Sequence, residues 1–352
     1  MLPYWLLFAL FALGALFSQP DLRRDKPIGM LLAGGAVLVL MIGLRDNIGV
    51  DWDNYLRAWN AAPTMSLERF LKFRPGDPVF YVIMWQMSNW EWPYWSLNLV
   101  CAVAFTWGLV RFARQQPNAW LAIAVAVPYL VIVIAMSGVR QATAIGFIFL
   151  ALASFRVGST KGFLLWTLVA ALFHASAIVV LPFAGLSLTR NRFQSLVLLV
   201  ATALLGYFVV GSTFDEYSRN YLGRYAVQSS GTVFRIWMSL LPAVIYLLLH
   251  RRLPLADRER SLWRNFSLLA VASVPLVFIV TSTTALDRLL LYAFPLQIMV
   301  LAWLPYLFGR RLERLGTIFL ILIYLGLQQY VFFNYAFNRY AYVPYRSILF
   351  GE

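Results

Sequence analysis

Residues 118–156 read NAWLAIAVAVPYLVIVIAMSGVRQATAIGFIFLALASFR, two apolar runs separated by the short stretch Ser137–Gln141. Each run is close to the roughly 20 residues that an α-helix needs to cross the hydrocarbon core of a bilayer. Further apolar runs lie at 2–17, 28–44, 95–113, 162–182, 193–211, 233–250, 264–281, 287–307 and 315–333. The sequence therefore predicts an all-α, polytopic transmembrane helix bundle of about 11–13 spans.

Composition and charge agree with a membrane protein. Hydrophobic residues make up 61% of the 352 residues and charged residues only 12%, whereas soluble domains carry about 25% charged residues. The formal net charge is +14, but the basic residues form short clusters between apolar runs, a pattern set by membrane topology. We therefore expect no nucleic-acid partner. The one cysteine, Cys101, excludes an intrachain disulfide and a cysteine-based metal site.

The basic clusters predict how the spans are oriented, because Lys and Arg concentrate in cytoplasmic loops. The clusters expected in the cytoplasm are Arg23/Arg24/Lys26, Arg111/Arg114, Arg156/Lys161, Arg190/Arg192, Arg251 to Arg264, and Arg310/Arg311/Arg314. The outer side then receives the N-terminus, 45–77, Ser137–Arg140, the region of His174, 212–232, 282–288 and the tail from 334.

This orientation makes two segments unusual. Segment 78–111 crosses once, which leaves 78–90 interfacial or re-entrant, and segment 162–188 reaches the outer side and returns with a break near His174. The rival topology uses two crossings in the first segment and one in the second. It places four more basic residues outside, namely Arg111, Arg114, Arg156 and Lys161. Charge counting favours the first topology.

We expect a single integral membrane domain, 1–352, with short outer loops at 45–77 and 212–232. In the first loop, Thr64 and Ser66 are suited to cap a short helix with Leu67, Phe70 and Leu71 on one face. This pattern is typical of an amphipathic helix at the membrane interface.

Charged residues inside or next to spans are costly and mark candidate sites. Arg45, Asp51 and Asp53 follow the second span directly. A solvated loop would explain them, but an arginine here opposes the positive-inside trend. Asp51 and Asp53 form a D-x-D, which holds a divalent metal in many glycosyltransferases, although a lone D-x-D is a weak pattern.

Two further candidates lie between apolar runs. Arg140 either snorkels to the interface or binds an anion such as pyrophosphate. His174 is either a hydrogen-bonded structural residue at a helix break or a general base, because imidazole titrates close to neutral pH. The other histidine, His250, precedes two arginines at a predicted cytoplasmic end.

The remaining candidates are basic residues near the predicted outer loops. Asp287 and Arg288 open a span and could pair with each other or bind a ligand. Arg219 and Arg224 are interleaved with tyrosines in the 212–232 loop. Together with the residues above they suit a substrate with an anionic leaving group, because arginines can neutralise a departing pyrophosphate and one base can deprotonate an attacking hydroxyl.

Four short elements run through the chain in order: an Arg before G-x-D-x-x-x-Y, then R-Q-x-x-A, F-H-x-S-A and R-L-x-x-Y, with a P-Y pair in the tail. Their residues are Arg45, Gly49, Asp51, Tyr55, Arg140, Gln141, Ala144, Phe173, His174, Ser176, Ala177, Arg288, Leu289, Tyr292, Pro344 and Tyr345. This series resembles the EpsG-type exopolysaccharide and O-antigen polymerases, the Wzy-like integral membrane proteins. Asp53 falls on a variable position of the signature, which shifts weight to Asp51.

The resemblance implies a GT-C-like fold in the bacterial inner membrane, with the active site on its periplasmic face. It also implies inverting, metal-independent transfer of an undecaprenyl-diphosphate-linked glycan chain onto a lipid-linked repeat unit. Donor and acceptor are then both undecaprenyl-diphosphate-linked oligosaccharides, and a chain-length regulator is a conceivable partner. We expect no metal and no other cofactor.

Within this hypothesis, His174 is the first choice for the catalytic base and Asp51 the second. The residues expected to bind pyrophosphate or sugar are Arg45, Arg140, Gln141, Arg288, Tyr55, Arg219 and Arg224. Three alternatives stay open: an O-antigen ligase with the same donor, a transporter or flippase of lipid-linked sugars, and an acyltransferase. The compact outer loops favour a polymerase over a ligase, and arginines gathered on one face disfavour transport.

Overall fold

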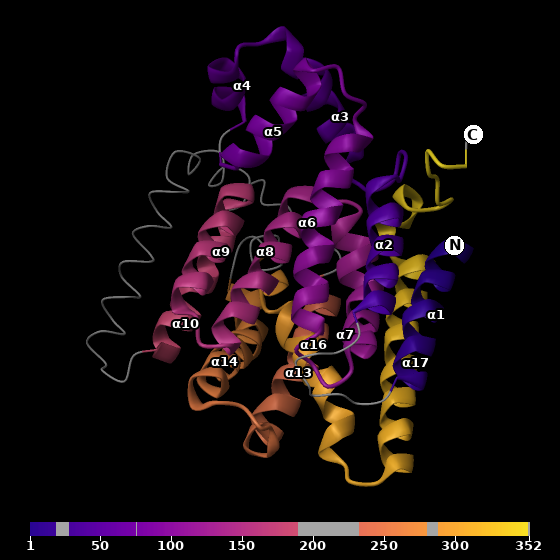
Figure 1. The fold of residues 1–352 in the computed structure, drawn as a ribbon, viewed down its shortest axis with the longest axis vertical. Helices are drawn as coiled ribbons and strands as arrows, with labels where there is room; N and C mark the ends of the chain where they lie inside the picture. The colour runs from indigo at the N-terminus through magenta and orange to yellow at the C-terminus, as the bar shows by residue number, and fades with distance from the viewer. Residues whose placement is uncertain (19–27, 75, 189–231, 280–287, 351–352) are drawn as a thin grey trace.

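The computed structural model describes residues 1–18, 28–74, 76–188, 232–279 and 288–350, and within these ranges it is a helical bundle without strands (Figure 1). The helices are α1 (Leu2–Phe17), α2 (Gly29–Gly43), α3 (Trp52–Ala61), α4 (Leu67–Phe73), α5 (Pro78–Asn89), α6 (Trp95–Ala113), α7 (Ala119–Ala126), α8 (Val139–Arg156), α9 (Thr160–Phe173), α10 (Val180–Leu188), α13 (Thr232–Leu249), α14 (Asp257–Ile279), α16 (Phe294–Trp303) and α17 (Arg311–Tyr335). The predicted all-α bundle is confirmed.

Five described helical segments are long and apolar enough to cross a membrane: Trp95–Ala113, Val139–Arg156, Phe234–Arg252, Arg288–Leu307 and Arg311–Tyr335. Five shorter apolar helices accompany them: Leu2–Phe17, Gly29–Gly43, Ala119–Ala135, Thr160–Phe173 and Ala175–Ser187. These segments overlap the predicted apolar runs, and two of them, Thr160–Phe173 and Ala175–Ser187, fall on the run predicted at 162–182. The predicted run at 264–281 lies on α14, which belongs to neither group. The predicted span at 193–211 and nearly all of the predicted 212–232 loop, with Arg219 and Arg224, lie outside the described residues.

Glycines allow two of the central helices to approach closely. A Cβ on Gly146 of α8 would lie 2.6 Å from Cα of Phe105 in α6, and a Cβ on Gly108 of α6 would overlap the carbonyl oxygen of Gly146. Small residues at helix interfaces are the usual means by which membrane helices bring their backbones together. The α6–α8 contact therefore depends on both glycines, and it positions the beginning of α8.

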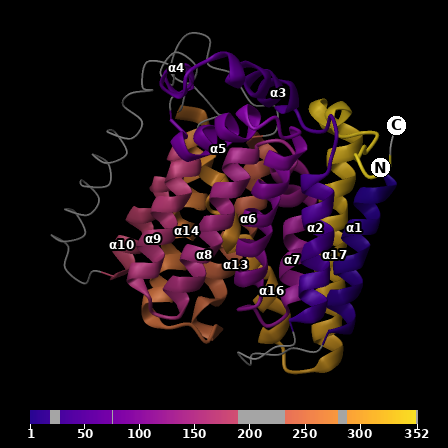
Figure 2. The ribbon, with the colours of Figure 1, turned by 45° about the horizontal axis from the view of Figure 1, so that its top comes forward.

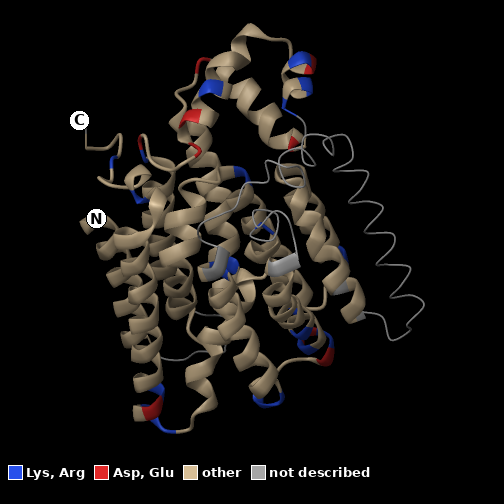
Figure 3. Ribbon diagram, turned by 180° about the vertical axis from the view of Figure 1, so that it is seen from behind, with Lys and Arg blue, Asp and Glu red and all other residues tan. Residues whose placement is uncertain are grey.

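The bundle has two ends that carry charged residues. Helices α3, α4 and α5 lie together beyond the ends of α6, α8 and α9, at the top in Figures 1 and 2; we call this the α5 end. At the opposite end, which we call the α14 end, Arg156 of α8 pairs with Glu259 of α14 at 3.7 Å. Figure 3 shows Asp and Glu at these two ends and Lys and Arg mostly there, with a few basic residues between them.

Segment 160–188 reaches the α5 end and turns back. Helix α9 ends at Phe173, His174 has extended backbone angles (φ −155°, ψ 109°), and the 3₁₀ turn Ala175–Val179 leads into α10. Asn265 of α14 donates hydrogen bonds to the Phe183 carbonyl and the Ser187 hydroxyl, so α10 runs back along α14. The break near His174 is present where the sequence predicted it.

A buried arginine joins four parts of the fold. Arg45 is 1% exposed. Its Nε donates to the carbonyls of Met136 (2.9 Å) and Ile48 (3.3 Å), and its Nη2 donates to Oδ1 of Asn98 (3.3 Å). Its Nη1 donates to the carbonyl of Ile42. Arg45 therefore ties the end of α2 to α6, to the segment before α8 and to its own loop.

The close approach of α6 and α8 generates a prediction about stability. Gly108→Ala should destabilise the protein by about 1–3 kcal/mol, the usual range for overpacking, because the added methyl group meets backbone that cannot rotate away. The measurement is the apparent unfolding midpoint of the protein in nanodiscs.

Gly316→Ala is the matched control, because it lies in helix α17 and a Cβ there meets nothing within 4 Å. We expect this control to be neutral or to gain up to about 1 kcal/mol from helix propensity. Equal midpoints for the two variants would contradict the proposed packing.

Candidate active site

The centre of the candidate site is Asp77, a residue that the sequence analysis did not single out. Its side chain is about 5% exposed, and it lies at the N-cap position of α5. Its carboxylate accepts hydrogen bonds from Nη1 of Arg140 (2.5 Å) and from the backbone N–H of Ala175 (3.0 Å). Nδ1 of His174 lies 3.1 Å from its Oδ2. One carboxylate thus joins α5, α8 and the break after α9.

The environment of Asp77 keeps its carboxyl group ionised. Burial by itself raises the pKa of Asp77, but the hydrogen bond and charge of His174, the charge of Arg140 and the Ala175 N–H together lower this pKa by more. The net result is a pKa below the usual aspartate value. Because an ionised carboxylate can only accept hydrogen bonds, it requires a proton on Nδ1 of His174.

The second ring nitrogen of His174 is left available. Nε2 is buried and has no hydrogen-bond partner within the described part of the chain. With the proton of a neutral imidazole on Nδ1, Nε2 carries the lone pair. A buried polar atom without a partner costs free energy and is a reason to look for a ligand. The dyad of Asp77 and His174 therefore presents a base, held in one orientation by the carboxylate.

Arg140, the second residue of α8, lies between two tyrosine rings. Its Cζ is 5.6 Å from the ring centre of Tyr55 and 5.3 Å from that of Tyr81, and its Nε donates to the Tyr55 hydroxyl at 3.3 Å. The hydrogen bonds to Tyr55 and Asp77 use Nε and Nη1, so Nη2 can still donate to an anion. Arginine remains charged in such an environment and binds phosphate through its fork of donors.

The charges of Arg140 and Arg288 both act on the carboxyl group of Asp51. Burial raises the pKa of the Asp51 carboxyl above its ordinary value, although the nearby charges of Arg140 and Arg288 act in the opposite direction. The backbone N–H of Asp51 donates to Oγ of Ser137 at 3.3 Å. Gln141 donates to the carbonyl of Arg288 at 3.3 Å, which joins α8 to the start of segment 288–307.

A further contact joins the histidine break to the segment that begins at Arg288. The hydroxyl groups of Ser176 and Tyr292 are 3.0 Å apart. Ser176 belongs to the F-H-x-S-A element and Tyr292 to the R-L-x-x-Y element. The structure therefore brings together residues of all four signature elements, although they are separated by up to about 240 positions in the sequence.

Three of the candidates from the sequence lie elsewhere. Arg45 is enclosed by the protein oxygen atoms described above, so its guanidinium is already used, and we assign it a structural role in place of the expected contact with pyrophosphate. Tyr345 of the tail pair donates to the Met41 carbonyl at 3.0 Å and supports the same region. Asp53 lines a separate pocket that does not include Asp51, so the D-x-D does not present two carboxylates to one ligand.

Asp77 was missed because its sequence context was treated as the end of a loop. The available signal was its position in Gly76-Asp77-Pro78, directly before an apolar stretch, in a chain with only 15 acidic residues. An acidic residue at the entrance of an apolar helix must be solvated or paired. Its partners are 63 and 97 positions away, which no local pattern reveals.

Comparison with known proteins gives the family. The sequence profile of the EpsG family matches residues 30–347, which include all four signature elements and the tail pair. No curated protein and no solved structure matched the chain. The matched stretch covers most of the chain and carries the residues that the structure gathers around Asp77. The chain is therefore a multi-pass membrane protein that belongs to the EpsG family.

Proposed function

We propose that this chain polymerises lipid-linked glycan repeats, by transferring a growing chain from undecaprenyl diphosphate to a lipid-linked repeat unit. The observation that carries the proposal is the buried cluster at the α5 end, in which Asp77 holds both Arg140 and His174. The cluster supplies a base whose Nε2 has no partner in the described part of the chain, and the charges of Arg140 and Arg288 act on it. Glycosyl transfer from a diphosphate donor needs both.

In the proposed reaction, an acceptor hydroxyl attacks the anomeric carbon of the donor from the face opposite the phosphate. The bond from the acceptor oxygen to the anomeric carbon forms as the bond to the phosphate oxygen breaks, so the configuration inverts. The hydroxyl proton moves to Nε2 of His174, and Asp77 stabilises the resulting imidazolium. Arg140 and Arg288 stabilise the departing pyrophosphate, which carries the leaving electron pair.

Asp51 takes a supporting part in this proposal. Its raised pKa reflects burial, and the charges of both arginines act on its carboxyl group, so we assign Asp51 to orienting these arginines or a sugar hydroxyl. His174 remains the first choice for the base because its Nε2 has no partner in the described chain. The two arginines supply positive charge at the leaving group, so the proposed transfer needs no metal ion.

The distribution of basic residues supports an outer-face location for the cluster. Four of the predicted cytoplasmic clusters lie at the α14 end. They follow α6, follow α8, join α13 to α14 and begin α17. Helix α8 separates Arg140 from Arg156 at this end by roughly 24 Å, given 1.5 Å per residue. By the positive-inside rule the α5 end then faces the periplasm. A GT-C-like arrangement remains part of this proposal.

An O-antigen ligase would use the same donor and the same leaving group, so it is the nearest rival. The acceptor distinguishes the two activities: a polymerase extends a lipid-linked repeat, whereas a ligase extends a lipid A core. A transporter is less well supported, because the gathered signature residues lie at one end of the bundle only. Membrane lipid and a chain-length regulator complete the proposed partners.

The function is tested with purified protein in nanodiscs and lipid-linked repeat units from cells that lack this gene, with products resolved by length. We expect a ladder of products that is unchanged by EDTA. His174→Ala should lower the rate by roughly 10²–10⁴-fold, the range typical for loss of a general base. His250→Ala is the control, since His250 lies at the α14 end and bonds only locally to the Leu247 carbonyl in the described structure.

A parallel reaction also contains lipid A core, and transfer to that core without a ladder would indicate a ligase. If neither product forms, glycosyl transfer is contradicted. A ladder abolished by EDTA would overturn the metal-independent mechanism. Equal rates in His174→Ala and His250→Ala would exclude His174 as the base.

The role of Asp77 gives a second prediction. Asp77→Asn preserves shape but removes the charge that fixes the imidazole and stabilises its protonated form. We expect kcat to fall by about 10²-fold or more while KM changes little, and Asp77→Glu should recover part of the rate.

Asp257→Asn makes the same chemical change at an exposed side chain of the α14 end, and it should leave both kinetic constants unchanged. Wild-type kcat per folded molecule in Asp77→Asn, with the whole loss of rate explained by a smaller folded fraction, would indicate a purely structural role for Asp77.

A further inference from the structure

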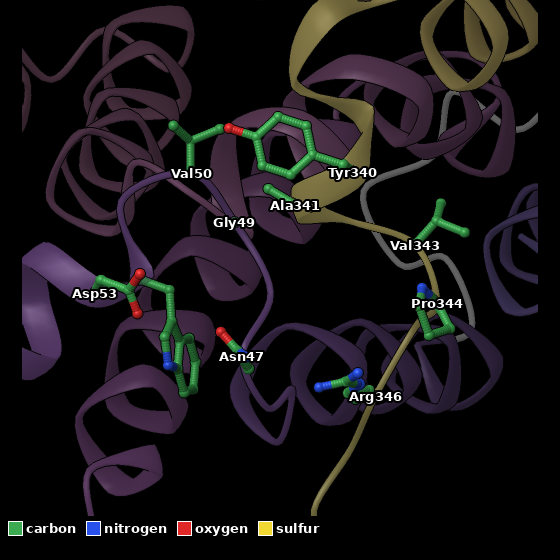
Figure 4. A pocket seen from close by; sticks show the side chains of 10 residues that line it. Asn47, Gly49, Val50, Asp53, Tyr340, Ala341, Val343, Pro344 and Arg346 are labelled. Atoms are coloured by element: carbon green, nitrogen blue, oxygen red, sulfur yellow. The ribbon is translucent and has the colours of Figure 1, made fainter.

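A pocket of about 290 Å³ lies at the α5 end, beside the candidate active site. Two segments form its walls: residues 47–53, and residues 340–346 of the tail. Figure 4 shows Asp53 and Arg346 on opposite sides of the hollow, with the Asn47 amide between them and the Tyr340 ring at the far edge. Its size is near the lower end of the roughly 300–1,000 Å³ that ligand pockets span.

The walls of this pocket are held firmly. The backbone N–H of Gly49 donates to the Ala341 carbonyl at 2.8 Å, and that of Asp46 donates to the Arg346 carbonyl at 3.1 Å. Arg45 fixes the same loop from inside through the Ile48 carbonyl. Gly49 has φ +104°, and a Cβ there would overlap the Met136 carbonyl. The pocket is therefore built by long-range contacts and does not arise from a loose loop on the surface.

The chemistry of the lining suits a saccharide. Asp53 accepts hydrogen bonds, Arg346 donates them, and Asn47 does both, which matches sugar hydroxyls that also donate and accept. One carboxylate and one guanidinium leave these walls without net charge, so they do not favour a phosphate group. The Tyr340 side chain is largely exposed, with a relative exposure of 70%, and offers a ring face to the C–H face of a sugar ring, with a hydroxyl beside it.

The pocket and the Asp77 cluster share one loop. Asp51 lies in the electric field of Arg140 and Arg288, while its neighbours Val50, Trp52 and Asp53 line the pocket. On the tail, Tyr342 points inward and donates to the Val133 carbonyl at 3.0 Å, while Ala341 and Val343 line the pocket. The same loop and the same tail segment thus contribute residues both to the pocket and to the protein interior beside it.

We infer that this pocket binds sugar rings of the lipid-linked substrate, as a glycan subsite separate from the pyrophosphate site at Arg140 and Arg288. This inference rests on the proposed function, and it names Tyr340, Asp53, Asn47 and Arg346 as the residues that hold the glycan. It also assigns a role to Asp53, which the reaction itself does not use. The subsite would bind an oligosaccharide segment of the substrate outside the position of the reacting sugar.

The test uses the lipid-linked oligosaccharide that accumulates in cells lacking this gene, and the free oligosaccharide released from it by mild acid. Turnover of the first and saturation-transfer NMR binding of the second are measured on the full chain in nanodiscs. Tyr340→Ala and Asp53→Asn should raise KM roughly five- to tenfold, as expected for loss of one aromatic or polar contact, with kcat retained. Both variants should also lose the NMR signal of the free oligosaccharide.

Matched controls separate this effect from a general change at the surface. Tyr340→Phe keeps the ring and should remain within about twofold of wild type for both readouts, since a tyrosine contributes mainly through its ring face. Tyr335→Ala removes an equally exposed tyrosine from α17, and Glu68→Gln neutralises an exposed acid of α4. Neither residue lines the pocket, so both variants should behave as wild type.

Each outcome is decisive. Wild-type KM and wild-type NMR binding in Tyr340→Ala and Asp53→Asn would overturn the subsite and leave the polymerase intact. If the wild-type protein forms no ladder, the proposed function fails, and binding of the free oligosaccharide still decides the subsite. Loss of binding in the two pocket variants with retention in the three controls supports the subsite in either case.

Discussion

A carboxylate that leaves water needs replacement partners, and in this protein that requirement joins distant parts of the chain. Asp77 obtains three: the Arg140 guanidinium, the His174 ring and the Ala175 N–H. Removing one partner from a buried ionic group typically costs about 3–5 kcal/mol. The orientation of α5, the beginning of α8 and the break after α9 are therefore set by the same charge. The base and the cation share this carboxylate, so one side chain fixes the positions of both.

Two kinds of contact position the helices and the loop around that cluster: close helix packing and hydrogen bonds from Arg45. Gly108 and Gly146 let α6 and α8 approach closely, which places the start of α8, and thus Arg140, against the helices of the α5 end. Arg45 bonds to oxygen atoms from four segments and holds the loop that carries Asp51. The same loop forms one wall of the polar pocket. Packing in the apolar core and hydrogen bonding at its edge thus determine the geometry of one region.

Most of the fold could be predicted from the sequence, because apolar runs of about 20 residues have one stable solution in a bilayer. The break at His174 could be predicted because a polar residue interrupts such a run and the basic clusters required a return. The short signature elements also identified Asp51, Tyr55, Arg140, Gln141, His174 and Arg288 as candidates, and the structure gathers these residues.

The remaining features depended on contacts that a sequence does not display. Asp77 was missed since its partners are far away in the chain, and Arg45 was assigned to the substrate because its sequence shows a charge but not the carbonyl groups that surround it. The pocket could not be predicted either, because half of it comes from the tail, about 290 positions after the loop that it faces. Burial and long-range pairing, rather than local pattern, decide such roles.

The most direct measurement of the central claim is a cryo-EM map of the protein in nanodiscs with a lipid-linked repeat unit whose anomeric oxygen is replaced by a methylene group, so that it binds without reacting. We predict that the density of the phosphonate–phosphate group lies between Arg140 and Arg288 at the α5 end, with the first sugar next to Nε2 of His174. Density for the anionic group among the arginines of the α14 end, or away from His174, would contradict the claim.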